Sequence, residues 1–154
     1  MRAVIQRVSS ASVITEGRRV AEIQRGMLVL LAVREGDGEQ AAAKFAEKIA
    51  GLRIFEDAGG KMNLDAASVG GAMLCISQFT LYGDVRRGRR PSFDRAARPE
   101  IAAPLYEHFC RSVEALGLPC GRGVFGAEMQ VEIVNDGPVT LIVDSDDLEL
   151  PRRT

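Results

Sequence analysis

The run Ser77-Gln78-Phe79-Thr80-Leu81 brings together groups that could take part in chemistry. It offers two hydroxyls and one carboxamide at the end of a predicted strand, residues 73–79, where backbone N–H groups lose their partners in a sheet. Free N–H groups of this kind can stabilise the oxyanion that forms when an ester carbonyl is attacked. The polar side chains can equally satisfy the end of their own strand, so spacing alone leaves both interpretations open.

A second candidate is Gly137-Pro138, which lies in the run Val134-Asn135-Asp136-Gly137-Pro138-Val139-Thr140. Proline cannot donate to a β-ladder, so this pair between two apolar strands predicts a turn, a bulge or a cis peptide. Taken alone, the pair favours a hairpin turn that joins a strand over residues 129–134 to one over 139–143.

The usual nucleophile and metal chemistries find little support in the sequence. His108 is the one histidine and falls in a predicted helix, with no serine or cysteine motif nearby, so a structural or surface role is favoured over a general base. Cys75 alternates inward on a predicted strand, which favours a small buried apolar role over a nucleophile. No His, Cys and Asp cluster has the spacing of metal ligands.

The segment from Tyr82 to Pro99 is rich in Gly, Arg, Pro and Asp, which predicts a long irregular loop of the kind that often carries function. Its basic residues are Arg86, Arg87, Arg89 and Arg90, continued by Arg95 and Arg98. They could form a solvated surface with Asp84 and Asp94 as counter-charges. In a protein that acts on RNA, they would instead contact phosphates.

Composition predicts one globular domain. The 154 residues are 46% apolar and carry a formal net charge of -1, so we expect no general attraction to nucleic acid, no DNA partner and only local RNA contacts. The odd number of cysteines, the lack of a C-x-x-C pair and the lack of a signal segment indicate reduced thiols in the cytoplasm. The longest apolar run, Met27 to Val33, is too short to cross a membrane.

Periodicity places the elements around these candidates. Strands are predicted over residues 2–10, 11–15, 18–24, 27–33, 52–56 and 73–79. The run 27–33 is apolar without alternation, which predicts a central strand covered on both faces. Helices are predicted over 39–51 and 100–116, with buried stripes of Ala42, Phe45, Ala46 and Ile49 and of Leu105, Phe109, Val113 and Leu116. We expect one domain over 1–144 and a polar C-terminal tail over 145–154 that frays at its end, Pro151-Arg152-Arg153-Thr154.

Read together, the two candidate segments resemble the SQFTL and NxGPVT signatures of D-aminoacyl-tRNA deacylases. These enzymes hydrolyse the ester that joins a wrongly charged D-amino acid to its tRNA. The intervening segment Gly88-Arg89-Arg90-Pro91-Ser92-Phe93 extends the resemblance, which covers Met1 to about Asp144. The one difference is Asp136 at the variable position of the second signature, which adds a negative charge near the site.

The resemblance implies an α+β fold: a single compact domain with curved, barrel-like, mostly antiparallel sheet packing and two main helices. It also implies a homodimer with active sites at the interface, and neither metal nor organic cofactor. The resemblance implies that the catalytic residues are Ser77, Gln78, Phe79 and Thr80. They would line the pocket that receives the 3′-terminal adenosine and its aminoacyl group.

The same resemblance implies that a cis Gly137-Pro138 enters the partner's pocket and that Arg7 holds this motif in place. The main-chain carbonyls of Gly137 and Pro138 would leave no room for an L side chain. Glycine has no side chain to exclude, so glycyl-tRNA(Ala) is an expected second substrate. In an enzyme acting on tRNA, the arginines of residues 86–90 become expected RNA contacts.

The implied chemistry needs no side-chain nucleophile. Backbone amides around Phe79 and Thr80 would bind the oxyanion, and the 2′-hydroxyl of the terminal ribose would assist the attacking water. Two alternatives stay open: a module that binds the tRNA end without catalysis, and a small esterase or thioesterase that uses Thr80 or Cys75.

Overall fold

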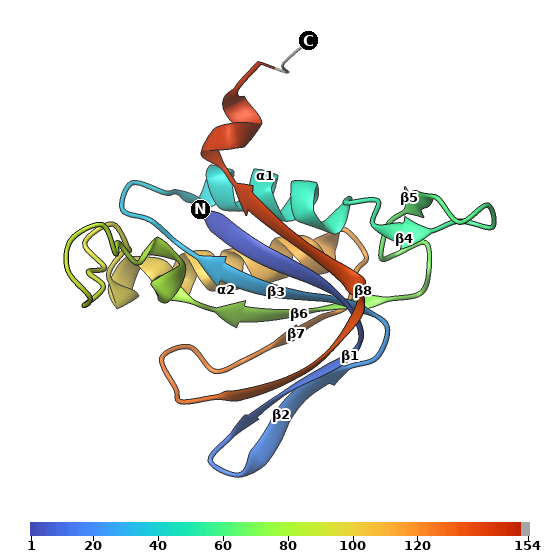
Figure 1. The fold of residues 1–154 in the computed structure, drawn as a ribbon, viewed down its shortest axis with the longest axis horizontal. Coiled ribbons are helices and arrows are strands. Elements are labelled where there is room, and N and C mark those ends of the chain that lie inside the picture. The colour runs from blue at the N-terminus through green and yellow to red at the C-terminus, as the bar shows by residue number, and fades with distance from the viewer. Residues whose placement is uncertain (152–154) are drawn as a thin grey trace.

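The computed structural model describes residues 1–151, which form a curved sheet with two helices on one side (Figure 1). Six strands make the main sheet, in the order β2-β1-β3-β6-β7 with β8 also paired to β1, and β4 and β5 form a separate pair. The strands are β1 (Arg2–Thr15), β2 (Arg18–Ile23), β3 (Gly26–Ala32), β4 (Phe55–Glu56), β5 (Met62–Leu64), β6 (Ala72–Ser77), β7 (Cys120–Arg122) and β8 (Gln130–Asp144).

Strand β1 organises this sheet because it is long enough to pair with three others. It runs antiparallel to β3 over residues 2–8, to β2 over 11–15 and to β8 along nearly its whole length. The pairs β3 with β6 and β6 with β7 are parallel. The predicted α+β domain with a curved, mostly antiparallel sheet and two main helices is confirmed.

The helices α1 (Glu39–Ala50) and α2 (Pro99–Ala115) lie side by side across one face of the sheet (Figure 1). The predicted stripe of α1 is fully buried, and Leu105, Phe109 and Val113 of α2 are buried with it. Leu116 was wrongly expected in this stripe: α2 ends at Ala115, and Leu116 is 50% exposed. Within residues 1–151, no helix is both long and apolar enough to cross a bilayer.

Strand β3 is covered on both faces, as its unbroken apolar run predicts. Met27, Val29 and Leu31 belong to the core beneath the helices, whereas Leu28 packs in a second cluster on the opposite face of the sheet. That second cluster also contains Val8, Ala11, Val13, Ile23, Leu74 and Ile76. The strands β1, β2 and β8 curl together, which gives the sheet its barrel-like shape (Figure 1).

The expected hairpin around Gly137-Pro138 is wrong, because residues 130–144 form one continuous strand, β8. Gln6 of β1 pairs with Thr140 and Val8 pairs with Asn135, so Arg7 alone stands opposite four residues, 136–139. The motif is therefore a wide bulge within a strand, and bulges of this kind redirect the backbone out of the ladder.

The polar segment after Asp144 begins with ordered structure. Asp146–Glu149 form a short 3-10 helix, η2, and both Asp146 carboxylate oxygens accept hydrogen bonds from Arg34, at 2.6 and 2.8 Å. This pairing lowers the pKa of Asp146. Residues 152–154 of the predicted tail lie outside the described residues, and the domain boundary after Asp144 stays a proposal.

Candidate active site

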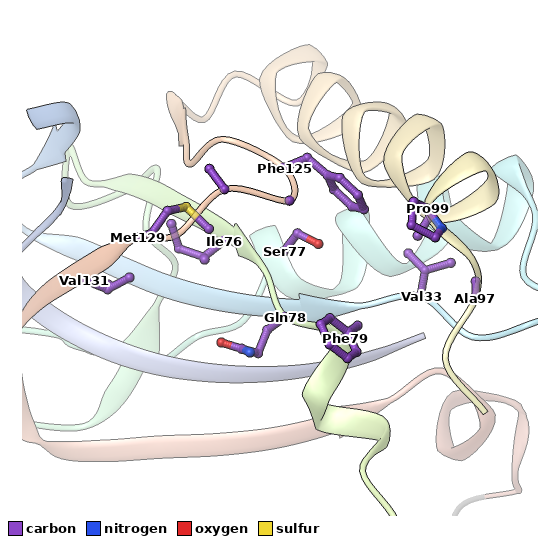
Figure 2. A pocket seen from close by; sticks show the side chains of 13 residues that line it. Val33, Ile76, Ser77, Gln78, Phe79, Ala97, Pro99, Phe125, Met129 and Val131 are labelled. Atoms are coloured by element: carbon purple, nitrogen blue, oxygen red, sulfur yellow. The ribbon is translucent and has the colours of Figure 1, made fainter. Parts of the chain in front are cut away.

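The main candidate site is a cleft of about 490 Å³ between the end of β6 and the start of α2. Figure 2 shows side chains from several elements pointing toward this space. Its lining residues are Val33, Ile76, Ser77, Gln78, Phe79, Ala97, Pro99, Ala102, Phe125, Gly126, Ala127, Met129 and Val131. The wall is mostly apolar, and its polar side chains are Ser77 and Gln78, which suits a ligand of mixed character.

Strand β6 delivers the polar groups to the cleft. The strand ends at Ser77, and the N–H of Gln78 still donates to Leu31 O, at 2.8 Å. The chain then turns into the short 3-10 helix η1 (Phe79–Tyr82). Ser77, Gln78 and Phe79 line the cleft, whereas Thr80 is not among the lining residues and accepts a hydrogen bond from the Gln78 amide.

The start of η1 presents backbone donors beside this cleft. Its first hydrogen bond within the turn runs from Leu81 N–H to Gln78 O, at 3.2 Å. The N–H groups of Phe79 and Thr80 precede that bond, so the helix offers them no acceptor. They are the donors that the sequence predicts for an oxyanion.

Sequence reasoning missed the opposite wall of the cleft. Phe125 and Met129 lie on the segment between β7 and β8, and Ala97 and Pro99 lie at the entry to α2 (Figure 2). These are ordinary apolar residues without a recognisable spacing. The two glycines at 123 and 126 give only a signal for a turn.

The Gly137-Pro138 bulge is held by Arg7, which is 7% exposed. Arg7 Nε donates to Asp136 O at 3.1 Å, and Arg7 Nη1 donates to Ile54 O at 2.8 Å. Asn135 closes the base of the bulge, since its amide donates to Arg7 O and Val139 O. The Asp136 carboxylate lies 3.3 Å from Arg7 Nε, so its charge is partly paired.

The bulge takes no part in lining the cleft of its own chain. The peptide bond between Gly137 and Pro138 is cis, and both residues are exposed. Neither is among the described residues that line the cleft. The structure therefore brings Ser77, Gln78 and Phe79 together but leaves Gly137, Pro138 and Arg7 as a separate group.

The arginine loop, defined here as Asp84–Ser92, projects from the end of η1. Asp84 and Ser92 pair at its base, with N–H to O distances of 2.8 and 3.0 Å. Arg86 is paired to Asp84, and its guanidinium holds the pKa of that carboxyl at about 2. Arg87 and Arg90 line a shallow depression of about 590 Å³ together with Asp84, Arg86, Ser92 and Asp94.

A comparison with models of protein families identifies the family of this chain. The family model described as D-Tyr-tRNA(Tyr) deacylase matches residues 4–144. The chain belongs to this family. The predicted enzyme class, a D-aminoacyl-tRNA deacylase and hence a hydrolase, is confirmed.

Relatives named D-aminoacyl-tRNA deacylase match almost the whole chain. The Koribacter versatilis protein is 63% identical and the Chloroflexus aurantiacus protein 58%, covering 94% and 99% of this chain and 97% and 96% of their own lengths. A solved structure named c-Myc DNA Unwinding Element Binding Protein is 38% identical with a TM-score of 0.87, covering 94% of this chain and 98% of its own. A probable eukaryotic D-amino acid tRNA deacylase shares the fold at 17% identity and a TM-score of 0.80, covering 92% and 97%.

In this deacylase, His108→Ala and Cys75→Ala are expected to keep most of the hydrolytic rate. Cys75 is fully buried, and burial raises the pKa of its thiol, which disfavours the reactive thiolate. His108 lies on α2 outside the cleft lining. Initial rates on D-tyrosyl-tRNA, with melting curves for folding, measure this. A folded variant without turnover would place that residue in the chemistry.

Proposed function

We propose that the cleft hydrolyses the ester of D-aminoacyl-tRNA, releasing the D-amino acid and tRNA. The observation that carries this is the position of the Phe79 and Thr80 amides, at the start of η1 beside an apolar cleft. An aminoacyl ester is already activated, so positioning and oxyanion stabilisation can supply the rate; loss of one such donor costs about 3 kcal/mol in other enzymes.

Ser77, Gln78 and Phe79 would position the 3′-terminal adenosine and its aminoacyl group in this cleft. Thr80 would act through its backbone amide and by orienting Gln78. The water attack would be assisted by the 2′-hydroxyl of the ribose, because none of the side chains lining the cleft is a strong base. Within the described part of the chain, no group of three or more His, Cys, Asp or Glu has metal-binding geometry, and the proposal uses no cofactor.

Gly137 and Pro138 of a partner chain would discriminate between D- and L-aminoacyl groups. Two observations support a homodimer with shared sites. The bulge is exposed and does not line its own cleft, and β8 carries exposed apolar side chains on either side of it: Val134 is 56% exposed and Ile142 76%. Main-chain carbonyls in the pocket would exclude an L side chain and would admit D residues and glycine, including glycyl-tRNA(Ala).

Matched D- and L-tyrosyl-tRNA, assayed with catalytic amounts of protein, test the activity. The D substrate is expected to turn over many times and the L substrate to remain. A D-tyrosyl-tRNA ending in 2′-deoxyadenosine is expected to react poorly. Binding without turnover would support the non-catalytic alternative. Equal hydrolysis of a simple ester would support an esterase using Thr80 or Cys75, although the burial of Cys75 argues against the latter.

Mixed dimers test whether the site is shared. Gly137→Ala leaves the cleft intact and alters the motif, whereas Phe79→Ala alters the cleft and leaves the motif intact. Refolding the two variants together in equal amounts should restore about a quarter of the wild-type rate, because half of the dimers are mixed and each holds one intact site. A mixture no more active than its separate components would contradict a shared site.

Arg86, Arg87, Arg89 and Arg90 would contact tRNA phosphates near the cleft. Arg87→Ala and Arg89→Ala are each expected to raise KM. Each should also reduce the slope of log KM against log salt concentration by about one, the contribution of one phosphate contact. Arg111→Ala, the same change at an exposed position on α2, is the control. A slope equal to that of the wild type would mean that the loop is a solvated surface without phosphate contacts.

A cytoplasmic location follows from the same proposal. Cys75, Cys110 and Cys120 are all buried and free, as expected in a reducing compartment. The 38% identical protein is named for binding a DNA element; the proposed partner of this chain is tRNA, without DNA or membrane.

A further inference from the structure

The base of the arginine loop is linked to the cleft by Phe93, the residue that directly follows the loop. This residue directly follows the Asp84–Ser92 pairing that closes the loop. Its ring meets the ring of Phe79 edge to face, with centroids 5.1 Å apart and planes at 74°. Phe79 lines the cleft, so the base of the loop contacts a cleft residue directly.

Gly83 makes room for this contact. A Cβ at Gly83 would lie 3.2 Å from Phe93 Cε1 and 3.0 Å from Thr80 O. The backbone φ of Gly83 is -61°, which any residue can adopt, so a side chain here is disfavoured by the close approach and not by the backbone conformation. The Phe93 ring therefore packs against both the Phe79 side chain and the end of η1.

The chain beyond Phe93 also leads into the cleft. Ala96 N–H donates to Phe93 O at 3.0 Å, and Ala97 N–H donates to Val33 O at 3.0 Å. Ala97 and Val33 both line the cleft. Phe93 thus lies between the arginine loop and the cleft residues Ala97 and Val33. The Phe79 side chain is 53% exposed, so it needs a neighbouring side chain to hold its ring in one rotamer.

We propose that Phe93 is a positioning residue for the reaction: it holds the Phe79 ring at the cleft mouth and fixes the arginine loop relative to it. The inference rests on the proposed function, in which Phe79 contacts the terminal nucleoside and the loop contacts tRNA phosphates. The Phe93–Phe79 contact then helps to set the distance between the phosphate-binding and ester-binding parts of the site.

The test measures binding of a non-hydrolysable amide, D-tyrosyl-3′-amino-adenosine, together with kinetics on D-tyrosyl-tRNA. Phe93→Leu keeps an apolar side chain but removes the ring edge. It is expected to weaken amide binding about tenfold and to raise KM by a similar factor, with kcat little changed. Phe93→Tyr keeps the ring and is expected to bind within about twofold of the wild type.

A double variant separates positioning from general stability. If Phe93 acts through Phe79, adding Phe93→Leu to Phe79→Leu should change binding by less than about twofold. The control is Phe45→Leu, which removes a ring from the core pair with Phe109, 6.3 Å apart; it should lower the melting temperature without changing amide affinity. If Phe93→Leu does not fold, Gly83→Ala takes its place: its Cβ would lie 3.2 Å from the Phe93 ring and should displace it, which should also weaken amide binding.

Wild-type affinity in Phe93→Leu, or effects of Phe79→Leu and Phe93→Leu that multiply, would overturn the inference. Failure of the amide to bind the wild type would also overturn it. If the wild type binds the amide and Phe93→Leu weakens binding, but D-tyrosyl-tRNA is not hydrolysed, the proposed function fails while the positioning role of Phe93 stands.

Discussion

The Gly137→Ala enzyme is expected to lose about 100-fold in kcat/KM for D-tyrosyl-tRNA, since a displacement of about 1 Å at an active site can cost that much. Gly137 has a φ of +136°, a conformation that L side chains rarely adopt. Its added Cβ would lie 2.8 Å from Val139 N, 2.9 Å from Val139 Cγ2 and 3.2 Å from Arg7 Nη2. The bulge must shift to relieve these contacts, and initial rates measure the consequence.

Gly17→Ala is the matched control. Gly17 also has a positive φ, +74°, but nothing lies within 4 Å of its hypothetical Cβ, in the turn between β1 and β2. It should lower the melting temperature and leave kcat/KM unchanged. If the Gly137→Ala enzyme is as active as the Gly17→Ala enzyme, the Gly137-Pro138 motif does not belong to the active site.

The second large effect is expected from Arg7→Met, which keeps the length of the side chain and removes its donors. Ile54 O and Asp136 O would lose their Arg7 hydrogen bonds, and a buried unpaired group costs about 1–3 kcal/mol of unfolding free energy. The bulge would also lose its anchor, so kcat/KM should fall about 100-fold. Urea unfolding and initial rates measure the two effects separately.

Arg19→Met provides the comparison for Arg7→Met. Arg19 is half exposed and its ion pairs with Glu22 and Glu132 lie at the surface, where such pairs contribute about 0–1 kcal/mol. Arg7→Lys should recover part of the activity, because an ammonium keeps the charge but cannot span both carbonyls in the same planar geometry. Full activity in Arg7→Met would mean that the bulge needs no anchor.

Features set by local periodicity could be predicted from the sequence. The buried face of α1 and the two-sided burial of β3 follow from the spacing of apolar residues within each element. The end of β6 at Ser77 was also close to its predicted position. Each of these depends on a few neighbouring residues, so the sequence contains the information locally.

The predicted hairpin was wrong because the contacts that decide the structure there come from residues distant in the sequence. Asn135-Asp136-Gly137-Pro138 has the chemistry of a turn, and a bulge uses the same residues. The choice between them is made by β1, which pairs with β8 on both sides of the motif. The Phe125 and Met129 wall and the Phe93 contact likewise depend on distant segments and carry no local signal.

The geometry around Arg7 links the site to the folding of the whole chain. Arg7 and Asp136 are 129 positions apart in sequence, and the hydrogen bond between them forms only when β8 has paired with β1. Contacts of such separation form slowly, because a long loop must close before they contribute. A chain in which β8 has not yet paired with β1 would lack both the shaped bulge and the β8 part of the cleft wall, Val131. Catalytic activity should therefore disappear together with global structure in denaturant, which makes enzyme rate a direct reporter of complete folding.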